Sequence, residues 1–184
     1  MSTPTQPRLV LHSSDADQTR GLARAVAPLC VPGDVVLLVG DLGAGKTTFA
    51  QGFGAGLGVV EPVTSPTFTL VRQYAVPLLP PPLRSGEEPS SSIRTLLHAD
   101  VYRLDHLHEI VDLGLAELVE DGAVALVEWG DVAEPVLGEG SLEVQLSAGP
   151  DDTERTITVS PHGHGWSERW HALGEVLAPW RVGG

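Results

Sequence analysis

The 184-residue chain has no asparagine, one cysteine (Cys30) and one lysine (Lys46). A single cysteine cannot form an internal disulfide, so we expect a reducing, cytoplasmic environment in which Cys30 is a small core residue. Guanine-specific GTPases read their base with an Asn/Thr-Lys-x-Asp motif. This chain has neither asparagine nor a second lysine with which to build that motif, so its composition excludes this class.

Long apolar runs and positive charge are also scarce. No apolar run approaches the ~20 residues of a membrane-spanning helix, and residues 1–7 lack the apolar core of a signal peptide, so we expect no membrane association. The formal net charge is −13, and the ten arginines are scattered. Nucleic-acid binding requires a basic stripe, so any contact with a nucleic acid is expected to pass through a more basic partner.

The one lysine lies in residues 40–47, whose sequence GDLGAGKT matches the phosphate-binding pattern G-x-x-x-x-G-K-[ST]. In such a P-loop the backbone N–H groups surround the phosphates, the lysine reaches the β- and γ-oxygens, and the following hydroxyl coordinates Mg²⁺. An apolar run at 34–39 predicts the strand that must precede the loop, and residues 47–51 predict the helix that follows. Together with the excluded guanine motif, this predicts ATP and Mg²⁺ as cofactors. The expected nucleotide contacts are Asp41, Leu42, Gly43, Ala44, Gly45, Lys46, Thr47 and Thr48.

Two acids end apolar strands, Asp100 after residues 94–99 and Glu128 after residues 123–127. Ligands in open α/β sheets bind beyond the carboxyl ends of the strands, and Mg²⁺ takes one or two carboxylates plus phosphate oxygens and waters. We therefore predict that both acids face the bound phosphates; the alternative for each is a solvated charge at a strand end. His98 has the same strand parity as Asp100, and we expect it to support Asp100 or to fill the core.

The order of patterns predicts the fold class. Strands are expected at 9–12, 34–39, 69–76, 94–100, 123–127, 142–146 and 156–159, with helices between them and an apolar tryptophan-rich helix near the C-terminus. Strands interleaved with helices predict a single α/β domain over residues 1–184, a P-loop NTPase-like three-layer sandwich with a mixed, mainly parallel sheet. The segment 77–92 is rich in proline and serine and is predicted to be a mobile insertion.

Four segments together resemble the TsaE family, also called YjeE: residues 40–48 (GDLGAGKTT), 64–68 (TSPTF), 98–104 (HADVYRL) and 127–129 (VEW). The resemblance implies a bacterial ATPase of tRNA threonylcarbamoyladenosine biosynthesis that is weak alone and works with TsaB and TsaD. Those partners, with TsaC, attach a threonylcarbamoyl group to the adenosine beside the anticodon of ANN-decoding tRNAs. The acidic charge agrees with a tRNA that is handled chiefly by the partners.

The resemblance also implies roles for individual residues. The implied catalytic residues are Lys46, Thr64, Asp100 and Glu128. Thr47 and Glu128 would hold Mg²⁺, with Asp100 also near the metal and the γ-phosphate. Residues 64–68 would act as a switch loop that senses the γ-phosphate, and Trp129 would lie close to the nucleotide.

The chain departs from the family pattern at two places and offers one further candidate residue. The segment 77–92 is longer than the family pattern leads us to expect, and Asp131 stands where many relatives carry glutamate. Arg155 is a further candidate for nucleotide contact.

Two other functions remain open on the sequence. A small-molecule P-loop kinase would need a lid with several arginines, and the sequence has no arginine-rich lid segment. A nonenzymatic adapter would use the nucleotide only as a structural plug.

Overall fold

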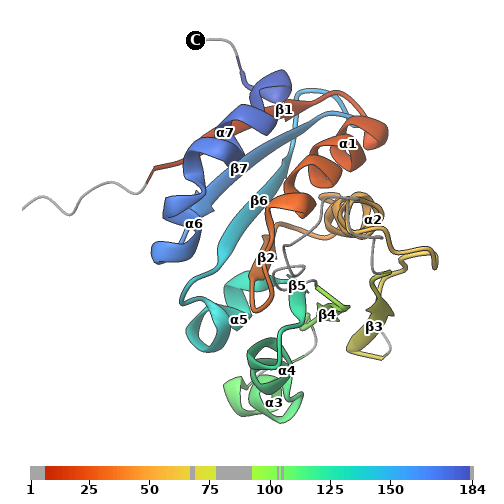
Figure 1. Ribbon diagram of the computed structural model, residues 1–184. Helices are drawn as coiled ribbons and strands as arrows, with labels where there is room; N and C mark the ends of the chain where they lie inside the picture. Colours follow the sequence, from red (N-terminus) through yellow and green to blue (C-terminus); the bar gives the residue numbers. More distant parts are fainter. Residues whose placement is uncertain (1–6, 67–68, 78–92, 103, 105, 183–184) are drawn as a thin grey trace, which may run out of the picture.

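The computed structural model describes residues 7–66, 69–77, 93–102, 104 and 106–182. Within these ranges one seven-stranded sheet has the order β1-β7-β6-β2-β5-β4-β3 (Figure 1). The strands are β1 (Leu9–Ser13), β2 (Val35–Val39), β3 (Val71–Ala75), β4 (Thr95–Asp100), β5 (Val124–Glu128), β6 (Leu142–Ala148) and β7 (Arg155–Pro161). The helices are α1 (Ala16–Val26), α2 (Lys46–Gly56), α3 (Leu107–Asp112), α4 (Leu115–Glu120), α5 (Gly130–Leu137), α6 (His164–Glu168) and α7 (Trp170–Val176), with 3₁₀ turns at Ala27–Leu29 and Ala178–Trp180.

The sheet is mixed and mainly parallel, which confirms the predicted fold class. Strands β4, β5, β2 and β6 pair in parallel, β7 is antiparallel to β6, and β1 is antiparallel to β7. Only β7 and the edge strand β3 therefore run against the other five described strands. The parallel register places Asp100 of β4 directly beside Glu128 of β5, so the two predicted acids end neighbouring strands.

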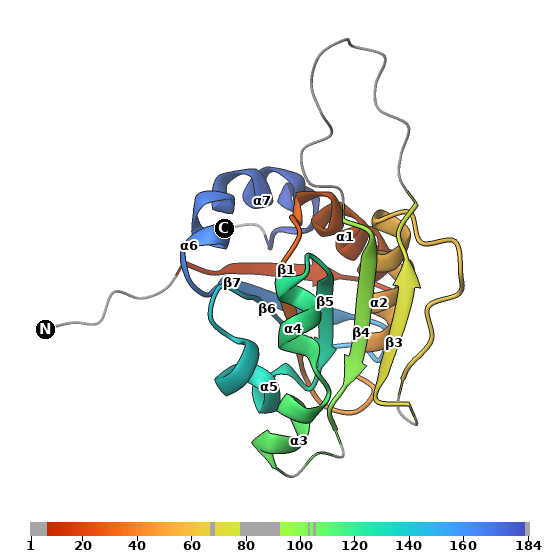
Figure 2. The same cartoon turned by 60° about the horizontal axis from the view of Figure 1, so that its bottom comes forward.

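Alternate residues of the central strands bury two separate cores, as expected of a sheet covered on both faces. On one face Val36 and Leu38 of β2 contact a core that includes Phe49 and Phe53 of α2 and apolar residues of α1, α6 and α7. On the other face β2 contributes Val35 and Leu37 to a core with α3, α4 and α5. In Figure 2, α4 and α5 lie in front of the sheet and α2 lies behind it. The two cores produce the predicted three layers.

Two glycines let α2 lie directly against α1. A Cβ at position 52 would overlap the Arg20 backbone, and one at position 56 would lie 2.7 Å from the Ala27 Cβ and 2.8 Å from the Arg24 carbonyl oxygen. Glycine lowers intrinsic helix stability, so these residues are explained by the close contact rather than by helix propensity. Because α2 begins at Lys46, this contact fixes the helix that carries the P-loop.

A partly buried ion pair ties the C-terminal helices to the start of β2. Arg169 donates to both carboxylate oxygens of Asp34, at 2.5 and 2.8 Å, and to the Leu29 carbonyl oxygen at 2.7 Å. Its guanidinium also lies 4.1 Å from the centre of the Trp166 ring. The hydrogen bonds to Asp34 raise the pKa of Arg169. Trp166 is fully buried, so the tryptophan-rich C-terminal segment packs in the core, as two short helices rather than one.

Three findings complete the comparison with the sequence. The structure adds helix α5, which the sequence patterns did not predict. None of the described helices is long and apolar enough to cross a bilayer. Apart from Pro77, the predicted mobile insertion at 77–92 lies outside the described residues.

We expect Gly52→Ala to destabilise the chain by about 1–3 kcal/mol, because the added methyl group meets the Arg20 backbone and no side-chain rotation relieves the overlap. Urea unfolding followed by circular dichroism measures the change. Gly165→Ala is the matched control, since Gly165 is an exposed helical glycine whose added Cβ meets only the end of the Arg169 side chain. Equal unfolding midpoints for Gly52→Ala and the parent chain would contradict the proposed role of the α1–α2 contact.

Candidate functional site

The loop of residues 40–45 connects the carboxyl end of β2 to the first residue of α2. Gly43 and Gly45 have φ angles of 79° and 105°. Glycine adopts this left-handed conformation readily because it has no Cβ, whereas other residues disfavour it. The loop therefore turns tightly enough to present backbone N–H groups at the start of α2. The positive end of the helix dipole and these N–H groups together form an anion-binding site.

Lys46 lies under the loop, with only 5% of the residue exposed. Its Nζ donates to the carbonyl oxygens of Gly40 at 2.6 Å and Asp41 at 2.8 Å, and it lies 4.1 Å from the centre of the Trp129 ring. Burial lowers the pKa of Lys46, although the negative charge of Glu128 and of other nearby acids opposes that change. The ammonium group is thus positioned beside the loop that would hold phosphate.

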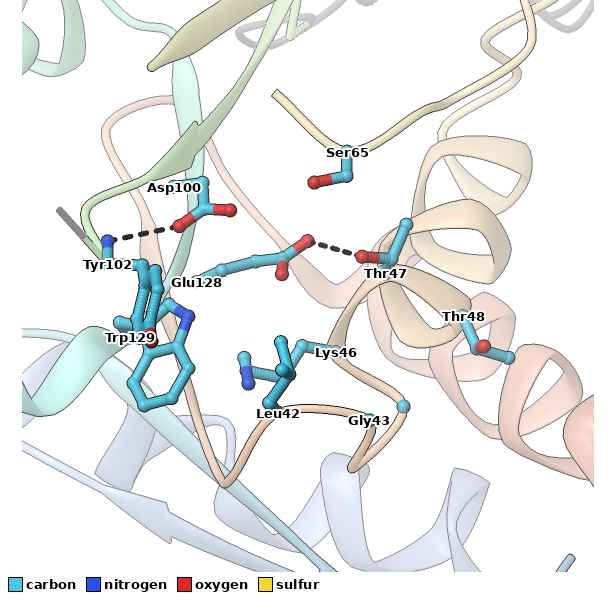
Figure 3. A pocket seen from close by; sticks show the side chains of 11 residues that line it. Leu42, Gly43, Lys46, Thr47, Thr48, Ser65, Asp100, Tyr102, Glu128 and Trp129 are labelled. Carbon is cyan, nitrogen blue, oxygen red and sulfur yellow. Dashed lines mark hydrogen bonds between the residues drawn. The ribbon is translucent and has the colours of Figure 1, made fainter. Parts of the chain in front are cut away.

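Thr47 and Glu128 meet across the site. The Thr47 hydroxyl donates to Glu128 Oε1 at 3.0 Å, and the neighbouring Asp100 accepts a hydrogen bond from the Tyr102 backbone N–H at 3.0 Å (Figure 3). Both carboxylates are almost fully buried. The two strand-end acids therefore lie together beside the P-loop threonine.

His98 is buried in the core, which is one of its two predicted roles, and the acid that it contacts is Glu128. Its Nε2 lies 2.8 Å from Glu128 Oε1, and the residue is fully buried. The sequence suggested either a place in the core or support of Asp100, which shares its strand parity. The structure shows that Glu128 reaches across from β5 to the histidine, since strands β4 and β5 are neighbours.

These side chains surround a cavity of about 420 Å³ beside the start of α2. The cavity is lined by Leu42, Gly43, Gly45, Lys46, Thr47, Thr48, Ser65, Asp100, Tyr102, Glu128 and Trp129. Figure 3 shows Asp100, Glu128 and Ser65 around one side of it and Lys46 and Leu42 on the other. Sequence reasoning did not single out Ser65 or assign Tyr102 to the site, although both belong to the segments that carried the family resemblance.

Thr64 lies next to the cavity rather than in its lining. Its backbone N–H donates to the Tyr74 hydroxyl at 3.2 Å, and Tyr74 itself is buried in the core. This contact fastens the chain just before Ser65. Thr67 and Phe68, the end of the expected switch loop, lie outside the described residues.

Arg155 contacts the outer side of the P-loop. Its Nε donates to the Ala44 carbonyl oxygen at 2.9 Å and its Nη2 to that of Gly43 at 3.2 Å. Its Nη1 donates to the carbonyl oxygens of Asp152 and Glu154, both at 2.7 Å. The guanidinium therefore connects the loop between β6 and β7 to the P-loop and does not line the main cavity. Asp41 and Ala44 line another hollow of about 270 Å³ on this outer side, together with Arg155.

Trp129 has an unusual backbone conformation for a bulky residue, with φ 62° and ψ 45°. Left-handed backbone at a non-glycine residue costs of order 1 kcal/mol and persists only where the surroundings enforce it. Here Gly130 packs against Leu37, where a Cβ would lie 2.9 Å from the Leu37 Cα, so the chain must turn sharply between β5 and α5. The turn holds the Trp129 ring over the site, tilted against Tyr102 at 4.6 Å between ring centres.

The residues present fit Mg²⁺ held jointly by protein and phosphate. No group of three or more histidine, cysteine, aspartate or glutamate side chains in the described part of the chain is arranged to hold a metal ion by itself. Mg²⁺ bound with phosphates needs only one or two carboxylates and a hydroxyl, because phosphate and water oxygens complete its octahedron. Thr47, Glu128 and Asp100 supply that set.

A strand, a glycine-rich loop and a helix, with a threonine facing a strand-end acid, define a P-loop nucleotide-binding protein. The chain matches the family model described as Threonylcarbamoyl adenosine biosynthesis protein TsaE over residues 13–157. It is 40% identical over 171 residues to the tRNA threonylcarbamoyladenosine biosynthesis protein TsaE of Bacillus subtilis, covering 93% of this chain and 94% of that protein. The chain therefore belongs to the TsaE family.

Two further comparisons agree with this membership. The TsaE protein of Streptomyces coelicolor is 40% identical over 152 residues, which cover 80% of this chain and 93% of the relative. The crystal structure of YdiB from Bacillus subtilis matches with a TM-score of 0.70 at 32% identity, covering 96% of this chain and 98% of that chain. The structural likeness to YdiB thus extends over nearly the whole length of this chain and of YdiB.

The lone lysine offers a direct test of the site's electrostatics. In the folded chain we expect a Lys46 pKa below the ordinary 10.5, because burial disfavours the charged form. The unfolded chain then binds more protons between the two pKa values, so folded-state stability should rise with pH across that window. Bound phosphate favours the ammonium and should raise the pKa again.

The measurement is a pH titration of the lysine ¹³Cε NMR signal, which needs no assignment because there is one lysine. The urea-unfolded chain supplies the reference value. A folded-state pKa at or above 10.5 without nucleotide would contradict the expectation.

Proposed function

We propose that this chain is the Mg²⁺-ATP-binding and ATP-hydrolysing member of the machinery that makes threonylcarbamoyladenosine in ANN-decoding tRNAs, working in the cytoplasm with TsaB and TsaD. The observation that carries the nucleotide part is the 3.0 Å contact between the Thr47 hydroxyl and Glu128 beside the Lys46 ammonium. Membership of the TsaE family carries the tRNA part. The relatives named above are tRNA threonylcarbamoyladenosine biosynthesis proteins.

In this proposal each side chain acts from the place where it already lies. Lys46 exchanges the carbonyl oxygens of Gly40 and Asp41 for phosphate oxygens, while the N–H groups at the start of α2 hold the remaining phosphate charge. Thr47 and Glu128 would hold Mg²⁺, which would neutralise phosphate charge when bound. Asp100 lies beside Glu128 and is the second carboxylate available to hold the metal or to orient the attacking water.

The direction of the P-loop suggests where the adenosine would lie. With the γ-phosphate held by Lys46, the nucleoside end of the molecule would extend away from Lys46, past the start of α2. A further hollow, of about 230 Å³ and distinct from the one beside Asp41, shares Gly45 and Thr48 with the main cavity. It is also lined by Thr19 and Arg155. We place the ribose and adenine there. Arg155 would then border the nucleoside while it fastens the loop.

Dependence on partners agrees with the charge of the chain. A protein with net charge −13 does not attract the tRNA phosphate backbone, so TsaB and TsaD would bring the substrate RNA. Thr64 and Ser65 would report the presence of the γ-phosphate, because Ser65 lines the cavity opposite Lys46. Such a loop gives the partners a means of controlling hydrolysis.

We expect slow ATP hydrolysis by the chain alone, stimulation by TsaB and TsaD together, and loss of at least about 10²-fold in Glu128→Gln, which removes charge from the metal site. Steady-state phosphate release measures all three. Glu175→Gln is the matched control, since it makes the same change at an exposed position on α7.

Each alternative has its own outcome. Transfer of labelled γ-phosphate to a metabolite rather than water would indicate a small-molecule kinase. Normal tRNA modification in a Glu128→Gln or Lys46→Ala strain would indicate a nonenzymatic adapter. A pair of TsaB and TsaD that neither binds nor stimulates the chain would contradict the partner assignment.

A further inference from the structure

His98 is a polar side chain in an apolar part of the sheet. It points to the same face of β4 as Leu96, and the register places it beside Leu126 of β5. The residue is fully buried, with 0% exposure. A buried imidazole is unfavourable unless it forms hydrogen bonds, so packing alone does not explain a histidine here.

The ring forms its hydrogen bond with a residue of the nucleotide site. Nε2 lies 2.8 Å from Glu128 Oε1, while Nδ1 is buried and has no hydrogen-bond partner among the described residues. A carboxylate oxygen accepts hydrogen bonds, so the hydrogen of the ring must be on Nε2. Within the described part of the chain, the contact with Glu128 is therefore what fixes the polar edge of the ring.

The same oxygen of Glu128 also receives the Thr47 hydroxyl, at 3.0 Å. Two donors, His98 on β4 and Thr47 on α2, therefore hold Oε1 of Glu128. Figure 3 shows the second carboxylate oxygen of Glu128 pointing into the cavity, on the side of Lys46. A glutamate has three rotatable side-chain bonds, and a single contact with Thr47 would leave the direction of that second oxygen free.

We propose that His98 is a positioning residue for the metal site: its Nε2–H holds Oε1 of Glu128 so that the other oxygen faces the place of Mg²⁺ and phosphate. Partners of this kind, which orient a metal-binding carboxylate without touching the metal, affect metal affinity about 10–100-fold. Asp100 has a different donor, the Tyr102 backbone N–H. The inference rests on the proposed Mg²⁺-nucleotide function and assigns a role that it did not include.

Two substitutions separate positioning from packing. His98→Leu keeps an apolar side chain of similar bulk but removes the donor. His98→Gln places an amide N–H close to the position of Nε2 and so retains it. The affinity for a fluorescent ADP analogue is measured for both variants and the parent chain, with Mg²⁺ and with EDTA.

We expect His98→Leu to lose about 10–100-fold of the affinity gained from Mg²⁺, and His98→Gln to recover most of it. In EDTA the three proteins should bind alike, because the P-loop is unchanged. Equal Mg²⁺ dependence in His98→Leu and the parent would overturn the proposal. So would equal losses of affinity with and without Mg²⁺, since these indicate a packing role.

A second measurement needs neither nucleotide nor metal. In ¹⁵N-labelled parent protein we expect a slowly exchanging His98 Nε2–H signal that shifts in Glu128→Gln. A proton found on Nδ1 instead would overturn the proposal even if every variant failed to fold. Absence of any Mg²⁺-dependent nucleotide binding by the parent would contradict the proposed function, while this NMR signal would still decide whether His98 holds Glu128.

Discussion

The hydrogen bond between Thr47 and Glu128 joins residues that are 81 positions apart, and the fold around it is what makes the contact short. The hydroxyl is fixed because α2 packs on α1 through Gly52 and Gly56. The carboxylate is fixed because β5 lies between β2 and β4 in the parallel sheet. Helix α2 and strand β5, which are held by different neighbours, thus meet at the Oε1 atom of Glu128. The arrangement of the proposed metal site depends on this contact.

The surroundings of Lys46 keep its ammonium group available for phosphate. The chain is strongly acidic and two carboxylates line the cavity, so an exposed cation would form ion pairs with nearby acids. Lys46 is instead enclosed by backbone carbonyl oxygens and the Trp129 ring. Trp129 occupies this place because its strained backbone turns the chain between β5 and α5. Arg155 has its donors on carbonyl oxygens outside the main cavity, so among the described residues that line this cavity the cation is Lys46.

The sequence was sufficient for whatever depends on local pattern. Spacing alone identified the P-loop, apolar runs identified the strands, and the acids that end two parallel strands had to lie at one edge of the sheet. It was insufficient where a side chain chooses between elements distant in the sequence. His98 shares parity with Asp100 yet contacts Glu128, and Arg155 reaches a loop more than 100 positions away. No local pattern encodes such directions. Helix α5 was missed because Pro135 and short length conceal its periodicity.

One wall of the cavity is fixed by the packing of α2 on α1, and the other is built from segments between regular elements. Backbone meets backbone at Gly52, so α2 cannot slide or rotate against α1 without breaking the core. The opposite wall consists of Ser65, Tyr102 and Trp129, which come from segments between regular elements. If the site cycles between a triphosphate and a diphosphate as proposed, we expect the difference in shape between the two states on that second wall. A partner that distinguishes the two states would then contact this side of the molecule.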